Sequence, residues 1–579
     1  MVDFCGPVIN QIPQINMEKG LIRIVGINGR FTHSCLALFY VRNELENNCA
    51  IFSHEIVQFI INDNYYEMLL RLTAGKPRYV FFSAAIWNSG IIEKLVQDLN
   101  RCSPGCGIVI GGPQAGVLKK RLKSISCTIV IGEIEAVGTG FYEDLISGDL
   151  KPCYEGSFFK MREQFFEYPY REEDFGSHLK NRHIYYESSR GCPFSCTYCL
   201  SAGERGVYHK DLHRVEAELT DILRYRPKVI RFVDRTFNDV SGRALAIWKF
   251  LAAREGDTLF HFEIAPDRFT EEMFDFLTTL ESGRFQFEIG IQSTNRPTLE
   301  AVQRKIDPGR VHNIVSRLSN LQNIHLHIDL ILGLPFETRE SFARSFADLF
   351  AMGAHYIQMG LLKILPDTPL CHSIDDFEYS HCAEPPYSIL KTRWMSHDCL
   401  SELYWFSECV EKFMNNRYFV SFWYYLRAIS EDIFAFFVEL LDICRESGFF
   451  QLAPTHELMA EKLCELAAGR EDRELILEFL RYDWLRCGHK FLPECICIDD
   501  SREQPRETKG FLYKSLPEEM SGIYRKGNRN HFFKKSFFMR MSDPALRGIG
   551  LGTTGKSGCV CILQEREKSL HKFNKVLLF

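Results

Sequence analysis

Short apolar runs alternate with stretches of helical periodicity from residue 21 to about residue 145. The apolar runs, which are the expected strands, are Leu21–Ile27, Ile51–Ile60, Tyr79–Ser83, Ile108–Ile110 and Thr128–Ile131. Continuous apolar strands that alternate with helices are typical of a parallel sheet covered on both faces. We therefore expect residues 1–150 to form a flavodoxin-like, doubly wound α/β domain, which would bind a ligand at the carboxyl ends of its strands.

A second strand–helix series begins at His183. Its expected strands are Ile184–Glu187, Val229–Val233, Leu259–Ile264, Phe285–Ile291, His325–Leu332 and Ile357–Leu362. This series predicts a partial (β/α)₆ TIM-like barrel over residues 183–370, with its functional face at the carboxyl ends of the strands. We expect the aromatic and charged residues 151–182 to be a linker, and residues 371–579 to form a mostly helical C-terminal domain of unknown role.

The composition narrows the class of protein. A chain of 579 residues is too long for one hydrophobic core. The formal net charge of −6 supplies no basic field that would recruit nucleic acid. No uncharged apolar stretch approaches the about 20 residues of a membrane span, and the amino terminus lacks the pattern of a secretory signal. We therefore expect a cytoplasmic protein without a membrane partner, in which the 21 cysteines are mostly reduced thiols.

Three of these cysteines form the most specific motif of the chain. Cys192, Cys196 and Cys199 have C-x₃-C-x₂-C spacing and come directly after the first expected barrel strand. A four-iron cluster usually takes four thiolates, so three in one loop would leave one iron open to the amine and carboxylate of a small molecule. A structural zinc site, completed by His209 or His213, is the alternative, but such sites typically use paired knuckles. We predict a 4Fe–4S cluster.

This triad, with Tyr198 directly before the third cysteine, resembles the signature of the radical SAM superfamily. The resemblance continues in order through residues 232–237, 262–266, 287–293, 329–338 and 362–369. It implies that the open iron binds S-adenosylmethionine (SAM). One electron from the reduced cluster would cleave the sulfonium, and the resulting 5′-deoxyadenosyl radical would abstract a hydrogen from the substrate.

Further candidates for SAM or substrate contact lie at the expected strand ends. Glu288 and Gln292 are evenly spaced on one strand and therefore face the same way; a buried, paired acid is the alternative role for Glu288. Gly333 would permit a close backbone approach near the adenine. The candidates in the barrel, besides the three cysteines, are Tyr198, Asp234, Glu263, Glu288, Gln292, Gly333 and Pro335.

Residues 21–145 resemble the cobalamin-binding domains that precede many radical SAM barrels. The segments that carry this resemblance are 28–37, 82–87, 109–114 and 130–135. Gly111 and Gly112 end a strand where a flat ligand could approach the backbone. The Asp-x-His-x-x-Gly sequence of corrinoid proteins with an axial histidine is absent after the first strand, although His33 lies in that loop. We expect cobalamin to bind without a histidine under cobalt; a docking domain that has lost its ligand is the alternative.

The chain is thus identified as a cobalamin-dependent radical SAM enzyme, with a C-terminal third similar to an uncharacterised helical extension of one subfamily. The resemblance implies an unknown small-molecule substrate and an electron donor such as flavodoxin or ferredoxin. Methyl transfer to an unactivated carbon is the leading hypothesis, and a rearrangement or ring contraction is equally open. The alternatives are a methylthiotransferase, a coproporphyrinogen-oxidase-like enzyme, or a non-catalytic iron–sulfur or corrinoid sensor.

Overall fold

The computed structural model consists of two compact units, Met1–Arg182 and His183–Phe579. It describes residues 20–203, 206–489, 491–497, 513–514, 530, 532, 536–551, 558–564 and 574–578. Within the described residues, no helix is long and apolar enough to cross a membrane.

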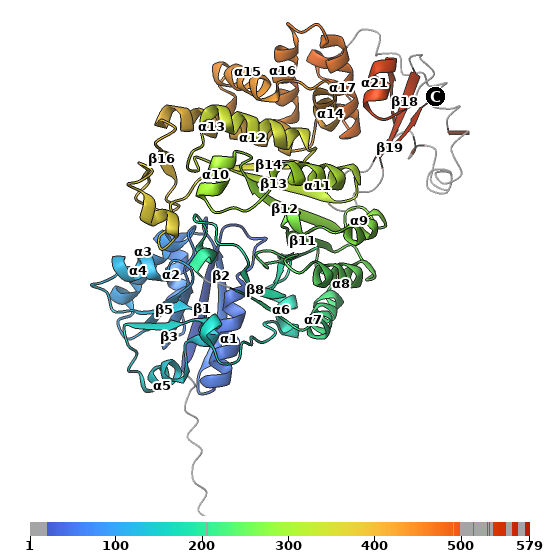
Figure 1. Cartoon of the computed structure of the whole chain (residues 1–579). Helices are drawn as coiled ribbons and strands as arrows, with labels where there is room; N and C mark the ends of the chain where they lie inside the picture. The colour runs from blue at the N-terminus through green and yellow to red at the C-terminus, as the bar shows by residue number, and fades with distance from the viewer. Residues whose placement is uncertain are drawn as a thin grey trace, which may run out of the picture. The chain divides into compact units, whose positions relative to one another are not determined.

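The first unit is built on a parallel six-stranded sheet in the order β2–β1–β3–β4–β5–β6 (Figure 1). Its strands are β1 (Leu21–Asn28), β2 (Ser53–Ile60), β3 (Tyr79–Ser83), β4 (Gly107–Gly111), β5 (Thr128–Gly132) and β6 (Cys153–Gly156). The strand order reverses between β1 and β3, so their carboxyl ends flank a topological switch point, where open α/β sheets bind ligands. The doubly wound fold predicted from the apolar runs is confirmed.

Helices cover both faces of this sheet. They are α1 (Leu36–Asn48), α2 (Tyr65–Thr73), α3 (Ser89–Cys102), α4 (Ala115–Arg121) and α5 (Thr139–Ser147). Val80 and Phe82 of β3 pack in one buried cluster with residues of α2, α3 and α4. Phe81, which points to the other face because strand side chains alternate, contacts Phe141 of α5 instead. The alternation of β3 thus supplies an apolar surface to both helical layers.

The segment predicted as a linker, residues 151–182, belongs to the first unit. Its first part forms the edge strand β6, paired in parallel with β5. Further along, Asp174 at the start of α6 (Glu172–Gly176) accepts two hydrogen bonds of 2.7 Å from the buried guanidinium of Arg42. A buried two-pronged ion pair fixes this segment to α1. The linker prediction was therefore wrong.

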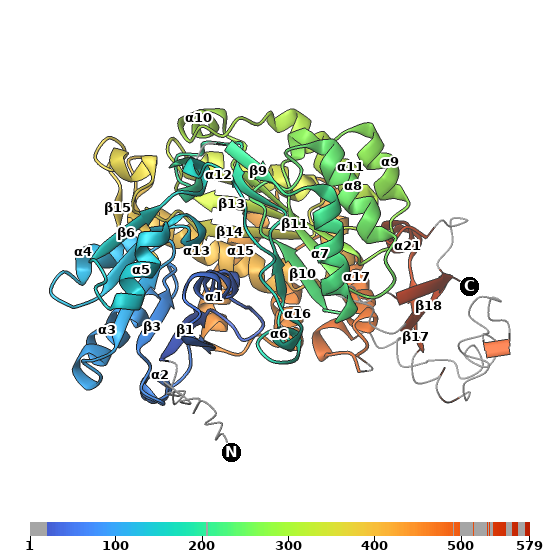
Figure 2. The same ribbon diagram turned by 90° about the horizontal axis from the view of Figure 1, so that it is seen from below.

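The second unit begins with a parallel, open six-stranded barrel in the order β14–β13–β12–β11–β10–β7. Its strands are β7 (Ile184–Tyr186), β10 (Val229–Phe232), β11 (Leu259–Glu263), β12 (Phe285–Gln292), β13 (His325–Leu332) and β14 (Tyr356–Leu361). Helices α7 (Leu212–Arg224), α8 (Ser241–Ala252), α9 (Glu271–Thr278), α11 (Pro308–Asn320) and α12 (Arg339–Ala351) connect them, and Figure 2 shows α7, α8, α9 and α11 along the outer side of the sheet. The predicted partial barrel is confirmed.

The two faces of the barrel strands differ in chemistry. The buried side chains of Phe262 and Phe287 surround Trp248 of α8 on the outer face. The alternate residues of the same strands, which include His261, Glu263 and Glu288, face the interior. Barrel interiors are usually filled by branched apolar side chains. This barrel instead has an aromatic outer core and a polar interior.

The C-terminal part of the second unit packs against the open edge of the barrel. Its helices are α13 (His397–Val410), the π-helical turn η6 (Glu411–Asn415), α14 (Val420–Ala428), α15 (Ile433–Glu446), α16 (His456–Ala467) and α17 (Arg473–Arg486). The Asn415 amide donates to the Ile357 carbonyl at 2.9 Å and accepts from the Ile357 N–H at 3.0 Å. One side chain thus satisfies backbone groups that edge strand β14 would otherwise leave unpaired.

The expectation of a mostly helical C-terminal domain is confirmed for residues 397–486. The sequence did not predict the antiparallel sheet that follows, in which β18 (Gly558–Gln564) lies between β17 (Ser536–Met541) and β19 (Asn574–Leu578).

Candidate active site

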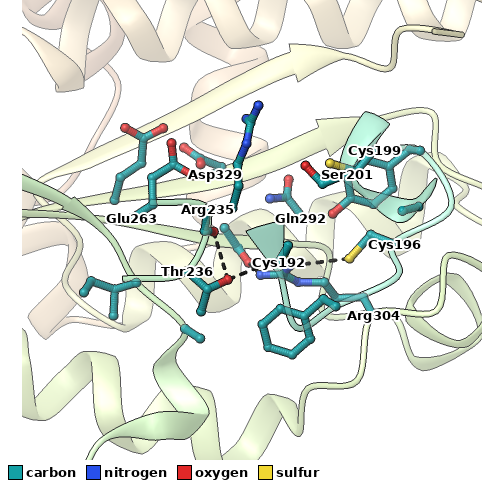
Figure 3. Close-up of a pocket in the computed structure, with 17 residues that line it drawn as sticks. Cys192, Cys196, Cys199, Ser201, Arg235, Thr236, Glu263, Gln292, Arg304 and Asp329 are labelled. Carbon is teal, nitrogen blue, oxygen red and sulfur yellow. Dashed lines mark hydrogen bonds between the residues drawn. The ribbon is translucent and has the colours of Figure 1, made fainter. Parts of the chain in front are cut away.

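The three cysteines of the motif line a single cavity of about 170 Å³ in the second unit (Figure 3). The cavity lies at the carboxyl ends of the barrel strands, which is where β/α barrels place their chemistry. Its lining residues are Cys192, Phe194, Cys196, Tyr198, Cys199, Ser201, Ala202, Arg235, Thr236, Glu263, Ile264, Ala265, Glu288, Gly290, Gln292, Arg304 and Asp329. The structure thus brings together the cysteines and four of the other predicted residues: Tyr198, Glu263, Glu288 and Gln292.

The cysteine loop follows strand β8 (Ser189–Cys192), which pairs with β9 (Gly206–His209) in a short antiparallel hairpin. All three motif cysteines are free thiols. The Thr236 hydroxyl lies 3.6 Å from the Cys192 sulfur, and the Arg304 guanidinium donates to the Cys196 sulfur at 3.6 Å. Hydrogen bonds to cysteine sulfur are among the features that tune iron–sulfur clusters. Three thiols that line one cavity, with a guanidinium donor beside one of them, are the protein ligands that a three-cysteine cluster site needs.

Three carboxyl groups, those of Glu263, Glu288 and Asp329, line the part of the cavity away from the cysteines. Figure 3 shows the labelled side chains of Glu263 and Asp329 grouped at a distance from Cys196 and Cys199. The strand register places Glu263 beside Glu288 on neighbouring strands β11 and β12. The interior of the barrel is therefore acidic at the level of the cavity.

The three acids differ in how they are compensated. The Glu288 carboxylate lies 2.8 Å from Nε2 of His261 and 3.6 Å from the Arg231 guanidinium, and the hydrogen bond from His261 lowers the pKa of Glu288. Burial raises the pKa of Glu263 to about 7. Burial, reinforced by the neighbouring Glu288 and Glu263, raises the pKa of Asp329 well above its ordinary value. A cationic ligand would stabilise the ionised forms of Glu263 and Asp329.

Gln292 reaches the cavity through a bulge at the end of β12. The pairing of β12 with β13 shifts in register between Gly290 and Gln292, and Gln292 has a φ of 72°, in the left-handed region. Bulges re-aim side chains next to active sites, and a non-glycine residue in this conformation costs about 1–3 kcal/mol. The even spacing of Glu288 and Gln292 predicted a shared face, and both residues line the cavity, although a bulge separates them.

Asp234 does not line this cavity. Its fully buried carboxylate accepts hydrogen bonds from the Ser188 N–H at 3.0 Å, the Ser188 hydroxyl at 2.6 Å and the Ser189 hydroxyl at 2.5 Å. Ser189 is the first residue of β8, which leads into the cysteine loop. Asp234 therefore contacts the strand that leads into the cysteine loop, and a contact with SAM stays a prediction.

Gly333 and Pro335 are also absent from the cavity lining. Gly333 has a φ of +85°, and a Cβ atom there would lie 2.0 Å from the Ile389 side chain. The Gly333 carbonyl accepts a hydrogen bond of 3.0 Å from the Tyr379 hydroxyl. Packing against the segment after the barrel is therefore sufficient to explain the glycine, and a contact with adenine stays a prediction.

Sequence reasoning did not single out five polar residues of the cavity: Ser201, Arg235, Thr236, Arg304 and Asp329. Three of them lie in segments that resemble the radical SAM family, so their strand-end positions were an available signal. Arg304 lies in no such segment. Its guanidinium reaches the cavity from the chain after α10 (Arg296–Ala301), and no spacing rule would have identified it.

In the first unit, Gly111 and Gly112 differ in their surroundings. Gly112 has a φ of +94°, and a Cβ there would lie 2.6 Å from the Ala84 carbonyl oxygen. Gly111 would bring a Cβ no closer than 3.9 Å to any atom. Internal packing thus explains Gly112, whereas a Cβ at Gly111 would make only an ordinary contact with the Val130 carbonyl. Nearby, Trp87 is 57% exposed, and its indole N–H donates to the Ile27 carbonyl at 3.1 Å.

Two family models match the chain. Residues 186–349 match the radical SAM superfamily, and residues 375–542 match a family described as a protein of unknown function, DUF4080. Residues 186–349 are thus a radical SAM domain, as the cysteine motif predicted. The helical region that packs on β14 lies within the second match.

Known relatives combine such a domain with cobalamin. The cobalamin-dependent radical SAM methyltransferase TokK of Streptomyces tokunonensis is 29% identical over 194 residues, which are 32% of this chain and 28% of TokK. The chain thus spans well under two thirds of that relative. A structure of the cobalamin-dependent SAM radical enzyme OxsB, with aqua-cobalamin bound, has a TM-score of 0.56 at 15% identity and covers 82% of each chain. The radical SAM methyltransferase TsrM from Kitasatospora setae, with tryptophan and a SAM analogue bound, has a TM-score of 0.51 at 15% identity, covering 63% of this chain and 79% of TsrM. These likenesses establish the fold.

Proposed function

We propose that this protein is a cobalamin-dependent radical SAM enzyme that transfers a methyl group to an unactivated carbon of a small molecule. The observation that carries the proposal is the cavity in which Cys192, Cys196 and Cys199 face a set of polar side chains at the carboxyl ends of the barrel strands. The radical SAM family match covers the residues that build it. TokK, a methyltransferase, supports the choice of reaction.

In this proposal the three cysteine thiolates hold a 4Fe–4S cluster. When bound, the cluster supplies the electron that cleaves SAM to methionine and a 5′-deoxyadenosyl radical, which abstracts a hydrogen from the substrate. Cys196 is nearly fully buried, and the Arg304 guanidinium donates a hydrogen bond to its sulfur. This donor would stabilise the added negative charge of the reduced state. An external donor such as flavodoxin or ferredoxin would supply the electron.

SAM would bind between the cysteine loop and the acidic part of the cavity. The ligand carries a sulfonium and an ammonium, both cationic, and a carboxylate. Glu263 and Glu288 would face the cationic groups, and Gln292 would hydrogen-bond to the polar end of the molecule. The guanidinium of Arg235 lines the same cavity and could pair with the carboxylate. The chain's contribution is to orient SAM and to exclude water from the radical.

Cobalamin would bind at the carboxyl ends of the strands in the first unit. When bound, it would supply the methyl group that is transferred. The strand end at Gly111, which has no side chain, and the exposed ring of Trp87 suit a large flat ligand. The indole nitrogen is held by the Ile27 carbonyl, which leaves the apolar faces of the ring available. The cobalamin-bound OxsB structure supports this assignment, because its fold extends over 82% of this chain.

The experiment that tests the proposal uses the full chain, purified anaerobically and reconstituted with iron and sulfide. We expect about four irons per chain and slow formation of 5′-deoxyadenosine from SAM after chemical reduction. Added hydroxocobalamin should remain bound after desalting at about one cobalt per chain. The variant that tests the cysteine assignment replaces Cys192, Cys196 and Cys199 with alanine. Its matched control replaces Cys371, a thiol of the same unit outside the cavity.

Each result addresses a separate part of the proposal. Iron that persists in the triple variant would place the cluster elsewhere and refute the cysteine assignment. A reconstituted cluster without SAM cleavage would favour a sensor. SAM cleavage without cobalt retention would leave a radical SAM enzyme whose first unit has lost its ligand, and methyl transfer from cobalamin would be refuted.

A further inference from the structure

The segment Val302–Arg304, directly after α10, contacts the cysteine loop at every residue. Three hydrogen bonds join it to consecutive loop residues: Thr197 N–H to the Val302 carbonyl at 3.1 Å, the Ser195 hydroxyl to the Gln303 side-chain carbonyl at 3.2 Å, and the Arg304 guanidinium to the Cys196 sulfur at 3.6 Å. The first bond joins two backbone groups, and the second joins two uncharged side chains; neither involves a cysteine. The third reaches a predicted cluster ligand directly.

The Arg304 guanidinium also contacts the strand that carries two predicted SAM-binding residues. Its Nη2 atom donates to the Gly290 carbonyl, at the point where β12 bulges before Gln292. The planar guanidinium presents its donors in a rigid fork, whereas a lysine ammonium is a single point charge on a flexible stem. One side chain therefore fixes the position of Cys196 relative to the bulge that aims Gln292 into the cavity.

Two arginine side chains lie near the Phe194 ring, and only one of them, Arg304, also lines the cavity. The guanidinium lies 5.5 Å from the centre of the Phe194 ring, and a second guanidinium, that of Arg268, lies 5.8 Å from the same ring. Arg268 is not part of the cavity lining, whereas Arg304 is. A cation that hydrogen-bonds a cluster thiolate stabilises the more negative, reduced cluster, because hydrogen bonding and net charge both set the potential.

We infer that Arg304 is a positioning residue that couples the cluster to the SAM site: it holds Cys196 against the bulge at Gly290 and makes the cluster easier to reduce. This inference rests on the proposed function, since it requires a cluster on Cys196. Nothing in the radical SAM motif assigns it, because Arg304 lies outside every segment of the resemblance.

The test measures the midpoint potential of the reconstituted cluster in the full chain by redox titration followed by electron paramagnetic resonance. The variants are Arg304→Met and Arg304→Lys, with Arg268→Met as the matched control that removes the other cation over Phe194. For Arg304→Met we expect full iron content and an about tenfold lower ratio of reduced to oxidised cluster at the wild-type midpoint, equivalent to about 59 mV for one electron. For Arg304→Lys we expect an about threefold decrease, since the charge is kept but the fork is lost. Arg268→Met should stay near wild type.

A second readout addresses the coupling to the SAM site. Addition of SAM should change the resonance spectrum of the reduced wild-type cluster, and this change should require about tenfold more SAM in Arg304→Met because Gln292 loses its fixed position. A wild-type potential and SAM response in Arg304→Met would overturn the inference, as would an equal shift in Arg268→Met. If Arg304→Met fails to hold iron, Arg304→Lys decides, and a wild-type potential there overturns the inference. A wild-type protein without any cluster would refute the proposed function instead.

Discussion

Asp234 offers a direct test of whether a strand-end acid binds a ligand or supports the loop that does. Its carboxylate accepts three hydrogen bonds, from the backbone and hydroxyl of Ser188 and from the hydroxyl of Ser189. In Asp234→Asn, one oxygen still accepts the two hydroxyls, but the amide NH₂ faces the Ser188 N–H. One buried donor then loses its acceptor, and the remaining bonds lose their charge assistance.

The magnitude follows from these contacts. A hydrogen bond to a charged group contributes about 1.5–3 kcal/mol, and an unsatisfied buried donor costs about 1–3 kcal/mol. We therefore expect Asp234→Asn to destabilise the second unit by about 2–3 kcal/mol. Thermal unfolding monitored by circular dichroism should show this as a lower midpoint of the corresponding transition. Ser189→Ala is the matched control, because it removes one of the three hydrogen bonds to the charged carboxylate and should cost about 1.5–3 kcal/mol.

The decisive comparison is the affinity for SAM. Since Asp234 contacts the strand that leads into the loop, the folded fraction of Asp234→Asn, measured well below its unfolding temperature, should bind SAM within about twofold of wild type. Loss of SAM affinity by tenfold or more with unchanged thermal stability would refute this reasoning and restore Asp234 to the ligand-binding role predicted from sequence. Isothermal titration calorimetry under anaerobic conditions gives the affinity, and iron content shows whether the cluster is intact.

Four further outcomes are expected. Burial raises the pKa of Glu263 to about 7, and we expect Glu263 to be ionised when it faces a cationic group of SAM. The affinity for SAM should therefore rise about tenfold from pH 6 to pH 8, and Glu263→Gln should abolish that dependence. A pH-independent affinity of the wild-type protein would contradict this reasoning. Gly112→Ala should lower the stability of the first unit by about 1–3 kcal/mol, because φ is positive and a Cβ would meet the Ala84 carbonyl. Gly111→Ala should leave stability unchanged but weaken cobalamin retention, and equal retention would remove Gly111 from the proposed site. His33→Ala should retain cobalt like wild type, whereas loss of cobalt would reveal an axial histidine.

The strands of both sheets could be predicted because their apolar runs are continuous and long enough to be read from one sequence. Edge strand β6 could not, since its four residues, Cys153–Gly156, form no continuous apolar run and none of them is fully buried. Its parallel partner β5, rather than its own composition, makes it a strand. The antiparallel sheet near the carboxyl end was missed although two of its strands contain short apolar runs, at 537–539 and 559–563, because neither run belongs to a repeated strand–helix pattern.

The residues of the candidate site also fall into those that local sequence rules predict and those that they do not. A local motif fixes the three cysteines, and the period of two fixes the direction of Glu263 and Glu288. Beyond the last paired residue of a strand that period no longer applies, so the direction of Asp234 depends on the turn that follows β10. Arg304 is further still from any local rule, because its contacts to Cys196 and Gly290 span 108 and 14 residues.

The period of two also separates stability from chemistry in this barrel. Phe262 and Phe287 pack outward against Trp248, while the adjacent Glu263 and Glu288 on the same strands face the cavity. Because the apolar core lies between the sheet and its helices, the interior can remain polar without removing the main source of folding free energy. An inward substitution such as Glu263→Gln should therefore change ligand binding more than stability. An outward substitution such as Phe287→Ala should cost about 3–5 kcal/mol and reach the site only through the position of the strand.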